Sequence, residues 1–376
     1  MRKRILFITW SFSNGGGVEK ILASIINNLH NVDIDILEIV HSGVKLESIN
    51  SNINVLPPLI KDFSHTKKSN WLIKLIKKLK YIYLDFIITK LNKFTISKYI
   101  KSNYDIEVAC SSLYPSFLLS NNPKSKKICW IHGTMEDLSN NIKLKNLQYE
   151  SFLKSDSILA ISNTVQSSLI NFYPYFKNKI IKVNNGYDFS SIISKSNEFE
   201  VNIENLILSV CRLDKNKNIN LLIEACNLMK LNNKKFTTII IGEGPEKNNI
   251  QKLINKYNLD DNVKLLGFLE NPYPYMKNAS VFCLTSFSEG FPTVLVESMT
   301  LGCPFISTKV SGTDELNPCG NCGILIDNNK YELFESLDLL LSNNTIREEK
   351  SLNCIKTVPQ FTLEKQLDNL KSIFNI

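Results

Sequence analysis

The 376-residue chain is predicted to be an α/β protein with two Rossmann-like, doubly wound domains that face a cleft. Short apolar runs alternate with segments whose apolar residues recur every three or four positions, which is typical of parallel strands joined by helices. The alternation pauses in a polar stretch near residues 189–203 and then starts again. We therefore expect a first domain at 1–188, a second at 189–360, and a C-terminal helix at 361–376 that packs back toward the first domain.

The first domain opens with a strand, a glycine-rich turn and a helix. Arg4–Trp10 is a short apolar run, and Val18–Leu29 has helical spacing. Between them lies Asn14-Gly15-Gly16-Gly17, whose glycines allow the backbone to approach a phosphate or a sugar closely. A helix is expected from Ser162 or Asn163 to about Phe172. Further strands are expected at 34–40, 105–110, 127–131, 157–161 and 179–183.

The second domain repeats the alternation of strands and helices. Its strands are expected at 206–210, 237–241, 263–266, 279–285, 304–308 and 323–326. Its helices are expected at 219–229, 245–257, 272–277, 293–301 and 330–341.

The segment that follows strand 279–285 is the most informative part of the chain. Glu289 lies in the expected loop, and Glu297 lies just over one turn into the next helix. Pro292 suits a helix start, where its missing N–H costs nothing. The N–H groups that open a helix can hold a phosphate, while one carboxylate binds sugar hydroxyls and the other a ribose. The candidate residues for binding such a phosphate-bearing sugar ligand are Gly290, Phe291, Pro292, Thr293, Val294 and Glu297.

Two other loops carry candidate polar residues. Arg212 and Lys217 follow a strand and precede a helix, and two cations at this spacing suit a diphosphate. A solvated basic turn is the alternative. His132 follows strand 127–131, where it is well placed to contact a sugar; a hydrogen-bonded loop histidine is the alternative.

Taken together, these motifs resemble the retaining glycosyltransferases of the GT-B architecture, in the bacterial group called family 4 or glycosyl transferases group 1. Glu289 and Glu297 match the family's Glu-x7-Glu signature, and Arg212 and Lys217 match its Arg-x4-Lys element. Cys211 departs from the pattern, because a glycine is common there. The resemblance implies the catalytic residues Glu289, Arg212, Lys217 and His132, and it adds Gly16 and Gly17 to the residues that bind the sugar donor. It also implies that the first domain binds the acceptor and that the second binds the nucleotide sugar.

The resemblance also implies a reaction. A nucleotide diphosphate sugar, expected to be a UDP-sugar, would donate its sugar with retention to a hydroxyl of a glycan or lipid-linked glycan. Such enzymes build bacterial surface polysaccharides such as O-antigen, lipopolysaccharide or capsule. Two alternatives remain open: a sugar-nucleotide 2-epimerase of the same fold, and a non-catalytic partner subunit.

No cofactor and no metal ion are expected. Asp33-Ile34-Asp35 has the spelling of a metal-binding DxD motif, but we interpret it as the start of a strand. Cys319 and Cys322 form one CxxC without a second pair or nearby histidines, and we interpret them as loop cysteines. Without a signal peptide, the nine cysteines are expected to be reduced thiols.

Charge is distributed unevenly along the chain. Residues 1–190 carry 25 lysines and arginines against 14 acidic residues, and residues 61–101 carry eleven lysines without arginine. With the aromatic residues Trp71, Tyr81 and Tyr83 nearby, this composition favours an anionic lipid surface over nucleic acid. We expect a cytoplasmic protein, peripheral on the inner face of the membrane, with no spanning helix.

The expected contact segment lies in the lysine-rich part of the first domain. Apolar residues at 72, 75, 76, 79, 82 and 86 repeat at helical spacing, and lysines stand at 74, 77, 78 and 80. The alternative is a helix whose apolar residues pack on their own domain.

Overall fold

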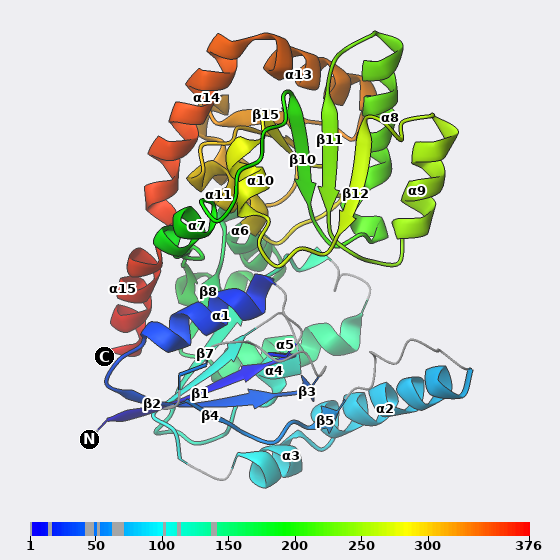
Figure 1. The fold of residues 1–376 in the computed structure, drawn as a ribbon. Coiled ribbons are helices and arrows are strands. Elements are labelled where there is room, and N and C mark those ends of the chain that lie inside the picture. The colour runs from blue at the N-terminus through cyan, green and yellow to red at the C-terminus, as the bar shows by residue number, and fades with distance from the viewer. Residues whose placement is uncertain are drawn as a thin grey trace. The chain divides into compact units, whose positions relative to one another are not determined.

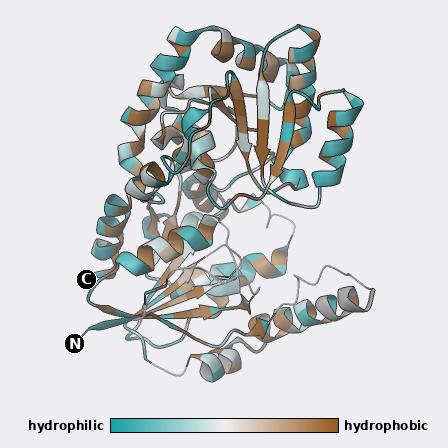
Figure 2. Ribbon diagram, in the orientation of Figure 1, coloured by the Kyte–Doolittle hydropathy of each residue, from teal (hydrophilic) through white to brown (hydrophobic). Residues whose placement is uncertain are grey.

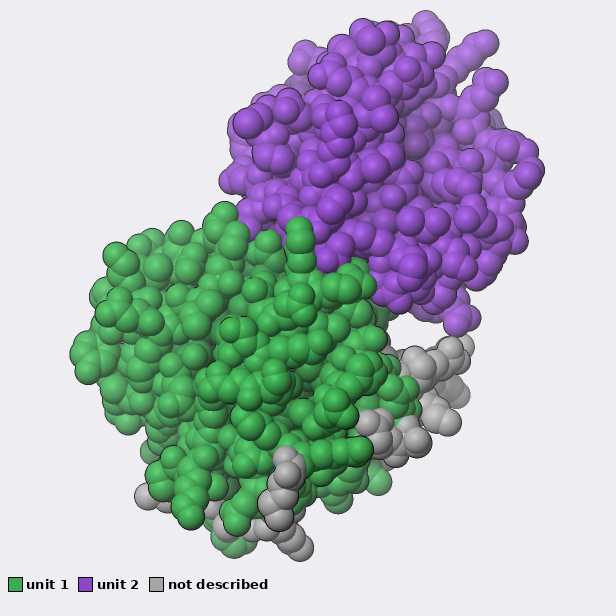
Figure 3. Space-filling view, turned by 90° about the vertical axis from the view of Figure 1, so that its left-hand side faces the viewer, with its two compact units in different colours: residues 1–187, 363–376 green, residues 188–362 purple. Residues whose placement is uncertain are grey.

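The structure is a computed structural model that describes residues 2–13, 17–41, 49–50, 53–61, 71–100, 103–110, 114–136 and 141–376 (Figure 1). Within these ranges, the side chains at 71–74, 76–77, 92–93 and 97 are not described. The chain divides into two compact units, which Figure 3 colours separately. Unit 1 comprises Met1–Tyr187 and Leu363–Ile376, and unit 2 comprises Asp188–Thr362.

Unit 1 contains a parallel sheet of seven strands in the order β4-β2-β1-β6-β7-β8-β9. The strands are β1 (Lys3–Thr9), β2 (Val32–Glu38), β4 (Ile53–Val55), β6 (Ile106–Cys110), β7 (Lys126–Ile131), β8 (Ser157–Ala160) and β9 (Ile180–Lys182). A separate pair consists of β3 (Val40–His41) and β5 (Ile60–Lys61). The helices are α1 (Gly17–Asn28), α2 (Trp71–Thr89), α3 (Asn92–Tyr99), α4 (Tyr114–Phe117), α5 (Ile142–Lys154), α6 (Asn163–Phe172), η2 (Pro174–Lys179) and α15 (Leu363–Phe374).

Local sequence explains the main elements of unit 1. The four central residues of β1, from Ile5 to Ile8, are completely buried, as expected of a strand covered on both faces of a parallel sheet. Helix α6 begins after Ser162, whose Oγ accepts a hydrogen bond from Val165 N at 3.1 Å. Ser162, and not Asn163, is therefore the cap.

Unit 2 contains a parallel sheet of six strands in the order β12-β11-β10-β13-β14-β15. The strands are β10 (Leu206–Val210), β11 (Thr237–Ile241), β12 (Val263–Gly267), β13 (Val281–Leu284), β14 (Phe305–Thr308) and β15 (Gly323–Ile326). The α-helices are α7 (Phe189–Lys195), α8 (Ile219–Leu231), α9 (Lys247–Lys256), α10 (Tyr273–Asn278), α11 (Thr293–Thr300), α12 (Thr313–Leu316), α13 (Lys330–Ser342) and α14 (Asn344–Thr357). The 3-10 helices are η3 (Lys215–Lys217), η4 (Pro318–Gly320) and η5 (Val358–Phe361).

The prediction of two Rossmann-like units with parallel sheets is confirmed. The interpretation of residues 189–203 as a purely polar linker is wrong, because they contain α7. Asp188 starts this helix by accepting a hydrogen bond from Ser191 N at 3.0 Å, and Ile192 is buried. Helix α7 packs against α10 and α11, so the first part of the supposed linker belongs to unit 2.

The strand orders identify where each unit can bind a ligand. From β1 the chain adds β2 and β4 on one side, whereas β6 and the later strands lie on the other side. From β10 it adds β11 and β12 on one side, and β13 begins the other. In doubly wound sheets, ligands bind beyond the carboxyl ends of the strands at such reversals. The loops after β1 and β6, and those after β10 and β13, are therefore the candidate ligand-binding loops.

None of the helices in the described part of the chain is both long and apolar enough to span a membrane.

Candidate active site

The loops after β10 and β13 are held together by hydrogen bonds across 70 residues of sequence. Asn216 accepts from Phe287 N at 2.8 Å through its backbone oxygen and donates from Nδ2 to Ser288 O at 2.8 Å. Thr285 Oγ1 donates to Lys217 O at 2.9 Å. The two loops that carry the predicted donor residues of unit 2 thus form one rigid pair.

Lys217 and Glu289 meet at the centre of this pair. Lys217 Nζ lies 2.6 Å from Glu289 Oε1, and Ser286 Oγ donates to the same oxygen at 2.6 Å. Their side chains are only 22% and 14% exposed, so the pair is screened from water much less than a surface ion pair. Lys217 ends η3, which Asp214 caps by accepting from Lys217 N at 3.3 Å. The geometry gives one cation and one carboxylate in fixed positions at the strand reversal.

Arg212 is the second cation of this loop and is far more exposed. Its Nε lies 2.8 Å from Asp214 Oδ2, and its side chain is 73% exposed. Asp214 therefore orders both cations of the loop: it accepts a hydrogen bond from the backbone amide of Lys217, and it pairs with the guanidinium of Arg212. The sequence motif named Arg212 and Lys217, but not this shared aspartate.

The turn after β11 fixes the Arg212 loop from the other side. Leu213 N donates to Glu243 O at 2.9 Å, and Glu246 N donates to Leu213 O at 2.9 Å. A Cβ on Gly244 would lie 2.2 Å from Leu213 O, so only glycine allows this approach. The glycine at 244 therefore has a geometric role, because it lets the two loops approach each other.

Glu297 lies on α11, in the helix predicted for it, and is almost fully buried. Tyr273 OH donates to Glu297 Oε1 at 3.2 Å. Burial, and then the neighbouring carboxylate, raise the pKa of Tyr273 far above its ordinary value, so its hydroxyl remains a donor. Sequence reasoning missed Tyr273, whose only signal was its place in the short helix before β13.

The start of α11 is arranged differently from a simple phosphate cradle. Pro292 is the N-cap residue and Thr293 the first helical residue, but Thr293 N already donates to Phe291 O at 3.0 Å. The Phe291 ring is buried, with its centroid 5.6 Å from that of Phe361. Ser311 Oγ donates to Gly290 O at 2.9 Å. Val294 is half-buried in the first turn.

The remaining predicted residues belong to unit 1. Gly17 is the first residue of α1, whereas Gly16 lies outside the described residues. His132 follows β7, its ring centroid is 5.1 Å from that of Trp130, and its Nδ1 is shielded from solvent with no partner among the described residues. Burial lowers the pKa of His132 to about 4, so the imidazole is neutral at pH 7.

A buried carboxylate that sequence reasoning missed organises the loop after β1. Glu38, at the end of β2, is 2% exposed, and its Oε1 accepts from Phe12 N and Ser13 N at 2.8 Å each. Ser11 Oγ and Ser13 Oγ donate to the same oxygen, and His41 Nδ1 lies 2.8 Å from Oε2. Ser13 immediately precedes the predicted Gly-rich turn. The available signal was an acidic residue near the end of an otherwise apolar strand.

The DxD spelling falls on β2, as interpreted. Asp35 Oδ2 accepts from Tyr104 OH at 2.5 Å and lies 3.4 Å from Arg4 Nη2, so neighbouring residues already occupy it. Among the residues that the structure describes, no group of three or more histidine, cysteine, aspartate or glutamate side chains could hold a metal. Cys319 lies exposed in η4, and Cys322 is buried directly before β15.

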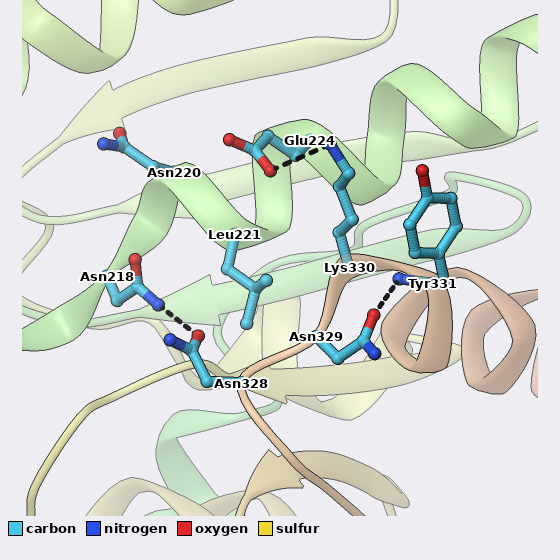
Figure 4. A pocket seen from close by; sticks show the side chains of 8 residues that line it. All are labelled: Asn218, Asn220, Leu221, Glu224, Asn328, Asn329, Lys330 and Tyr331. Carbon is cyan, nitrogen blue, oxygen red and sulfur yellow. Dashed lines mark hydrogen bonds and ion pairs between the residues drawn. The ribbon is translucent and has the colours of Figure 1, made fainter.

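A separate polar pocket of about 450 Å³ opens at the N-terminal ends of α8 and α13 (Figure 4). Across it, Asn218 Nδ2 donates to Asn328 Oδ1 at 2.8 Å, and Lys330 Nζ lies 3.5 Å from Glu224 Oε2. The lining consists of Asn218, Asn220, Leu221, Glu224, Asn328, Asn329, Lys330 and Tyr331, none of which was predicted to bind the donor.

Known proteins resemble both the chain and its fold. An N-acetylgalactosamine-N,N'-diacetylbacillosaminyl-diphospho-undecaprenol 4-alpha-N-acetylgalactosaminyltransferase of Campylobacter jejuni is 32% identical over 61% of this chain and 62% of its own length. The chain thus spans less than two thirds of that relative. An uncharacterized glycosyltransferase of Methanocaldococcus jannaschii is 28% identical over 83% of this chain and 80% of its own length.

Solved structures show the same fold at low sequence identity. The crystal structure of Anabaena Alr3699/HepE in complex with UDP superposes with a TM-score of 0.72, at 17% identity over 99% of both chains. The fold is therefore that of the GT-B glycosyltransferases.

The sequence model of the family described as Glycosyl transferases group 1 matches residues 192–361. This range contains β10 to β15 and the whole Lys217–Glu289 arrangement. Residues 192–361 of this chain are therefore similar to the glycosyl transferases group 1 family.

Proposed function

We propose that the chain is a retaining, family-4-type glycosyltransferase that transfers a sugar from a UDP-sugar to a hydroxyl of a lipid-linked glycan. The biosynthesis of a bacterial surface polysaccharide, such as O-antigen, lipopolysaccharide or capsule, is its proposed role. The observation that carries the proposal is the Lys217–Glu289 pair at the strand reversal of unit 2, inside the segment that matches the family.

The chemistry follows from where negative charge develops. When the bond to the sugar breaks, charge builds up on the departing diphosphate, and fixed cations stabilise that state more than the ground state. Lys217 supplies a mostly buried and weakly screened cation, and exposed Arg212 supplies a planar guanidinium that can bind phosphate oxygens. The Thr293 amide is already engaged, so the two cations carry most of this stabilisation.

The carboxylates and the histidine then position the donor. Glu289 would accept from sugar hydroxyls while Lys217 and Ser286 hold its Oε1. Glu297, oriented by Tyr273, would accept from the ribose hydroxyls. The neutral imidazole of His132 can hydrogen-bond a sugar hydroxyl without adding charge. The acceptor hydroxyl would attack on the face from which the diphosphate leaves, which retains the anomeric configuration.

The name of the Campylobacter relative supports a lipid-linked acceptor, since that protein acts on a diphospho-undecaprenol glycan. We propose the same class of acceptor, a glycan on a diphospho-lipid, for this chain, but not the same sugars.

Donor turnover tests the proposal. The purified protein is incubated with UDP-N-acetylgalactosamine, UDP-N-acetylglucosamine, UDP-galactose or UDP-glucose, and UDP release is followed with and without glycan-diphospho-lipid acceptors. We expect slow hydrolysis of one donor and faster release with an acceptor. NMR of the product should show the donor's anomeric configuration, and excess EDTA should leave the rate unchanged.

Three outcomes would contradict parts of this proposal. Conversion of a donor into its 2-epimer without UDP release would identify the epimerase alternative. Failure to turn over any donor in the presence of acceptors would favour the non-catalytic subunit. Loss of activity in EDTA, restored by Mn²⁺ or Mg²⁺, would contradict metal independence.

We also propose that α2 attaches the protein to an anionic membrane on the cytoplasmic side. Two opposite faces of this helix are apolar. Leu84, Ile87 and Ile88 are buried in unit 1. Leu75, Leu79, Ile82 and Phe86 form an exposed stripe, with exposed fractions between 45% and 57%. Figure 2 colours part of α2 as hydrophobic. An exposed apolar stripe beside lysines suits the boundary between anionic headgroups and acyl chains.

Cosedimentation with vesicles tests the attachment. We expect binding to phosphatidylglycerol vesicles at low salt, weaker binding at high salt, and little binding to phosphatidylcholine, since each lysine near an anionic surface contributes about 1 kcal/mol. A variant with serine at Leu79, Ile82 and Phe86 should bind less, as should one with glutamine at Lys74, Lys77, Lys78 and Lys80. Equal partition onto neutral and anionic vesicles would contradict the electrostatic part.

A further inference from the structure

Three aromatic side chains from distant parts of the sequence gather at the strand reversal of unit 1. Trp10 directly follows β1, Tyr114 opens α4 in the connection after β6, and Tyr81 lies on α2. The Trp10 ring centroid is 5.4 Å from that of Tyr114 and 6.4 Å from that of Tyr81, whose plane is inclined by only 14° to the indole. Their surroundings leave room for contact, because Trp10 and Tyr114 are half-buried and Tyr81 is 45% exposed.

Polar groups border these rings. Tyr114 OH donates to Asp85 Oδ1 at 3.1 Å, and Lys143 Nζ donates to Asp85 Oδ2 at 3.3 Å. Asp85 lies four residues after Tyr81, so both point to the same flank of α2. Asp85 and Lys143 are 40% and 51% exposed, so each retains capacity for a further hydrogen bond.

We propose that Trp10, Tyr81 and Tyr114, together with Asp85 and Lys143, form a binding platform for a sugar ring of the glycan acceptor. This inference rests on the proposed function and names the part of unit 1 that would recognise the acceptor. Its position matches the rule for doubly wound sheets, since β1 and β6 are the neighbours at which the strand order reverses.

The chemistry of the platform favours a sugar over other ligands. The C–H face of a pyranose packs on aromatic rings, and tyrosine and tryptophan add hydrogen-bonding edges. A carboxylate accepts from the hydroxyls of a sugar, whereas it repels a phosphate. Burial, and then Asp85, raise the pKa of Tyr114 to about 12, so its hydroxyl is protonated at neutral pH and remains a donor.

The platform also adjoins the proposed membrane contact. Tyr81 and Asp85 lie on the same helix as the exposed stripe of Leu75, Leu79, Ile82 and Phe86. A glycan whose lipid is embedded in the membrane would therefore reach Tyr81 and Asp85 before it reaches the other residues of the platform. One face of α2 would thus contact the lipid, and another face would bind the sugar.

Saturation-transfer NMR with simple glycosides tests the platform independently of catalysis. The probes are the methyl α-glycosides of N-acetylgalactosamine, N-acetylglucosamine, galactose and glucose. We expect at least one to receive saturation from the wild-type protein through its ring protons. Trp10→Ala and Tyr81→Ala should weaken its binding at least five-fold. Tyr83→Ala is the matched control, because Tyr83 lies on the opposite flank of the same helix and should leave binding unchanged.

A second readout separates this inference from the proposed function. If the chain is a glycosyltransferase, Trp10→Ala and Tyr81→Ala should raise the KM for a glycan-diphospho-lipid acceptor by a larger factor than they change the rate of acceptor-free donor hydrolysis, whereas Tyr83→Ala should change neither. Absence of any glycoside binding to the folded wild-type protein, or equal binding by Trp10→Ala and wild type, would overturn the platform. Glycoside binding without turnover of any donor would support the platform and contradict the proposed function.

Discussion

Replacing Lys217 by alanine is expected to reduce donor turnover by roughly 30- to 1000-fold, or about 2–4 kcal/mol of transition-state stabilisation. The reason is its low exposure: a cation at 22% exposure acts on the diphosphate with little screening, and water replaces it poorly. The loss should appear in kcat and kcat/KM alike, because the charge it balances develops in the transition state. Steady-state UDP release by the wild type and the variant measures it.

Lys234→Ala is the matched control for Lys217→Ala. Lys234 also pairs with a carboxylate of unit 2, at 2.7 Å from Asp338, but it lies just beyond the C-terminal end of α8 and not in a loop at the strand reversal. Its removal should cost about 1 kcal/mol of stability or less and leave turnover unchanged. Wild-type turnover by a folded Lys217→Ala protein would refute the assignment of this cation to the diphosphate.

Replacing Glu38 by leucine is expected to destabilise unit 1 by about 3–5 kcal/mol. The leucine would leave Phe12 N and Ser13 N buried without an acceptor, and each such donor costs about 1–3 kcal/mol. Glu38→Gln is the conservative counterpart, since its remaining oxygen can still accept from both amides and its new amide can donate to His41. Urea unfolding monitored by hydrogen exchange in β1 and β2 measures the stability that unit 1 loses in each of the two variants, separately from the stability of unit 2.

The same residue predicts a dependence on pH. Burial alone would raise the pKa of Glu38, but hydrogen bonds from Ser13, His41 and two backbone amides lower it overall below 4.5. The contribution of the Glu38 carboxylate to the stability of the folded state is therefore complete above its ordinary pKa. It is lost as the pH falls through the lower pKa of the folded state. Glu38→Gln should lack this part of the acid sensitivity. Equal stability of the leucine and glutamine variants would contradict the role of the side-chain oxygen as the acceptor that holds the loop.

Much of the fold was predictable because secondary structure depends on local patterns. The apolar runs at β1, β10 and β13 are buried strands, and Glu297 lies on the helix that was predicted to follow Pro292. Where local signals are weak, prediction failed. Helix α14 has a mostly polar sequence and was not predicted, and α7 was hidden in a stretch interpreted as a linker.

The sequence by itself determined the fold class, the order of the elements and the loops that carry Arg212, Lys217 and Glu289. Only the tertiary structure decided which of these side chains meet. Lys217 reaches Glu289 across 72 residues because β10 and β13 are neighbours in the sheet. Trp10 reaches Tyr114 because β1 and β6 are neighbours, whereas Tyr273 reaches Glu297 because α10 packs against α11. Tyr81 joins Trp10 because α2 packs against α4. Local periodicity specifies which face of a strand or helix is apolar, whereas partners at such distances depend on strand order, which the packing of the whole sheet establishes.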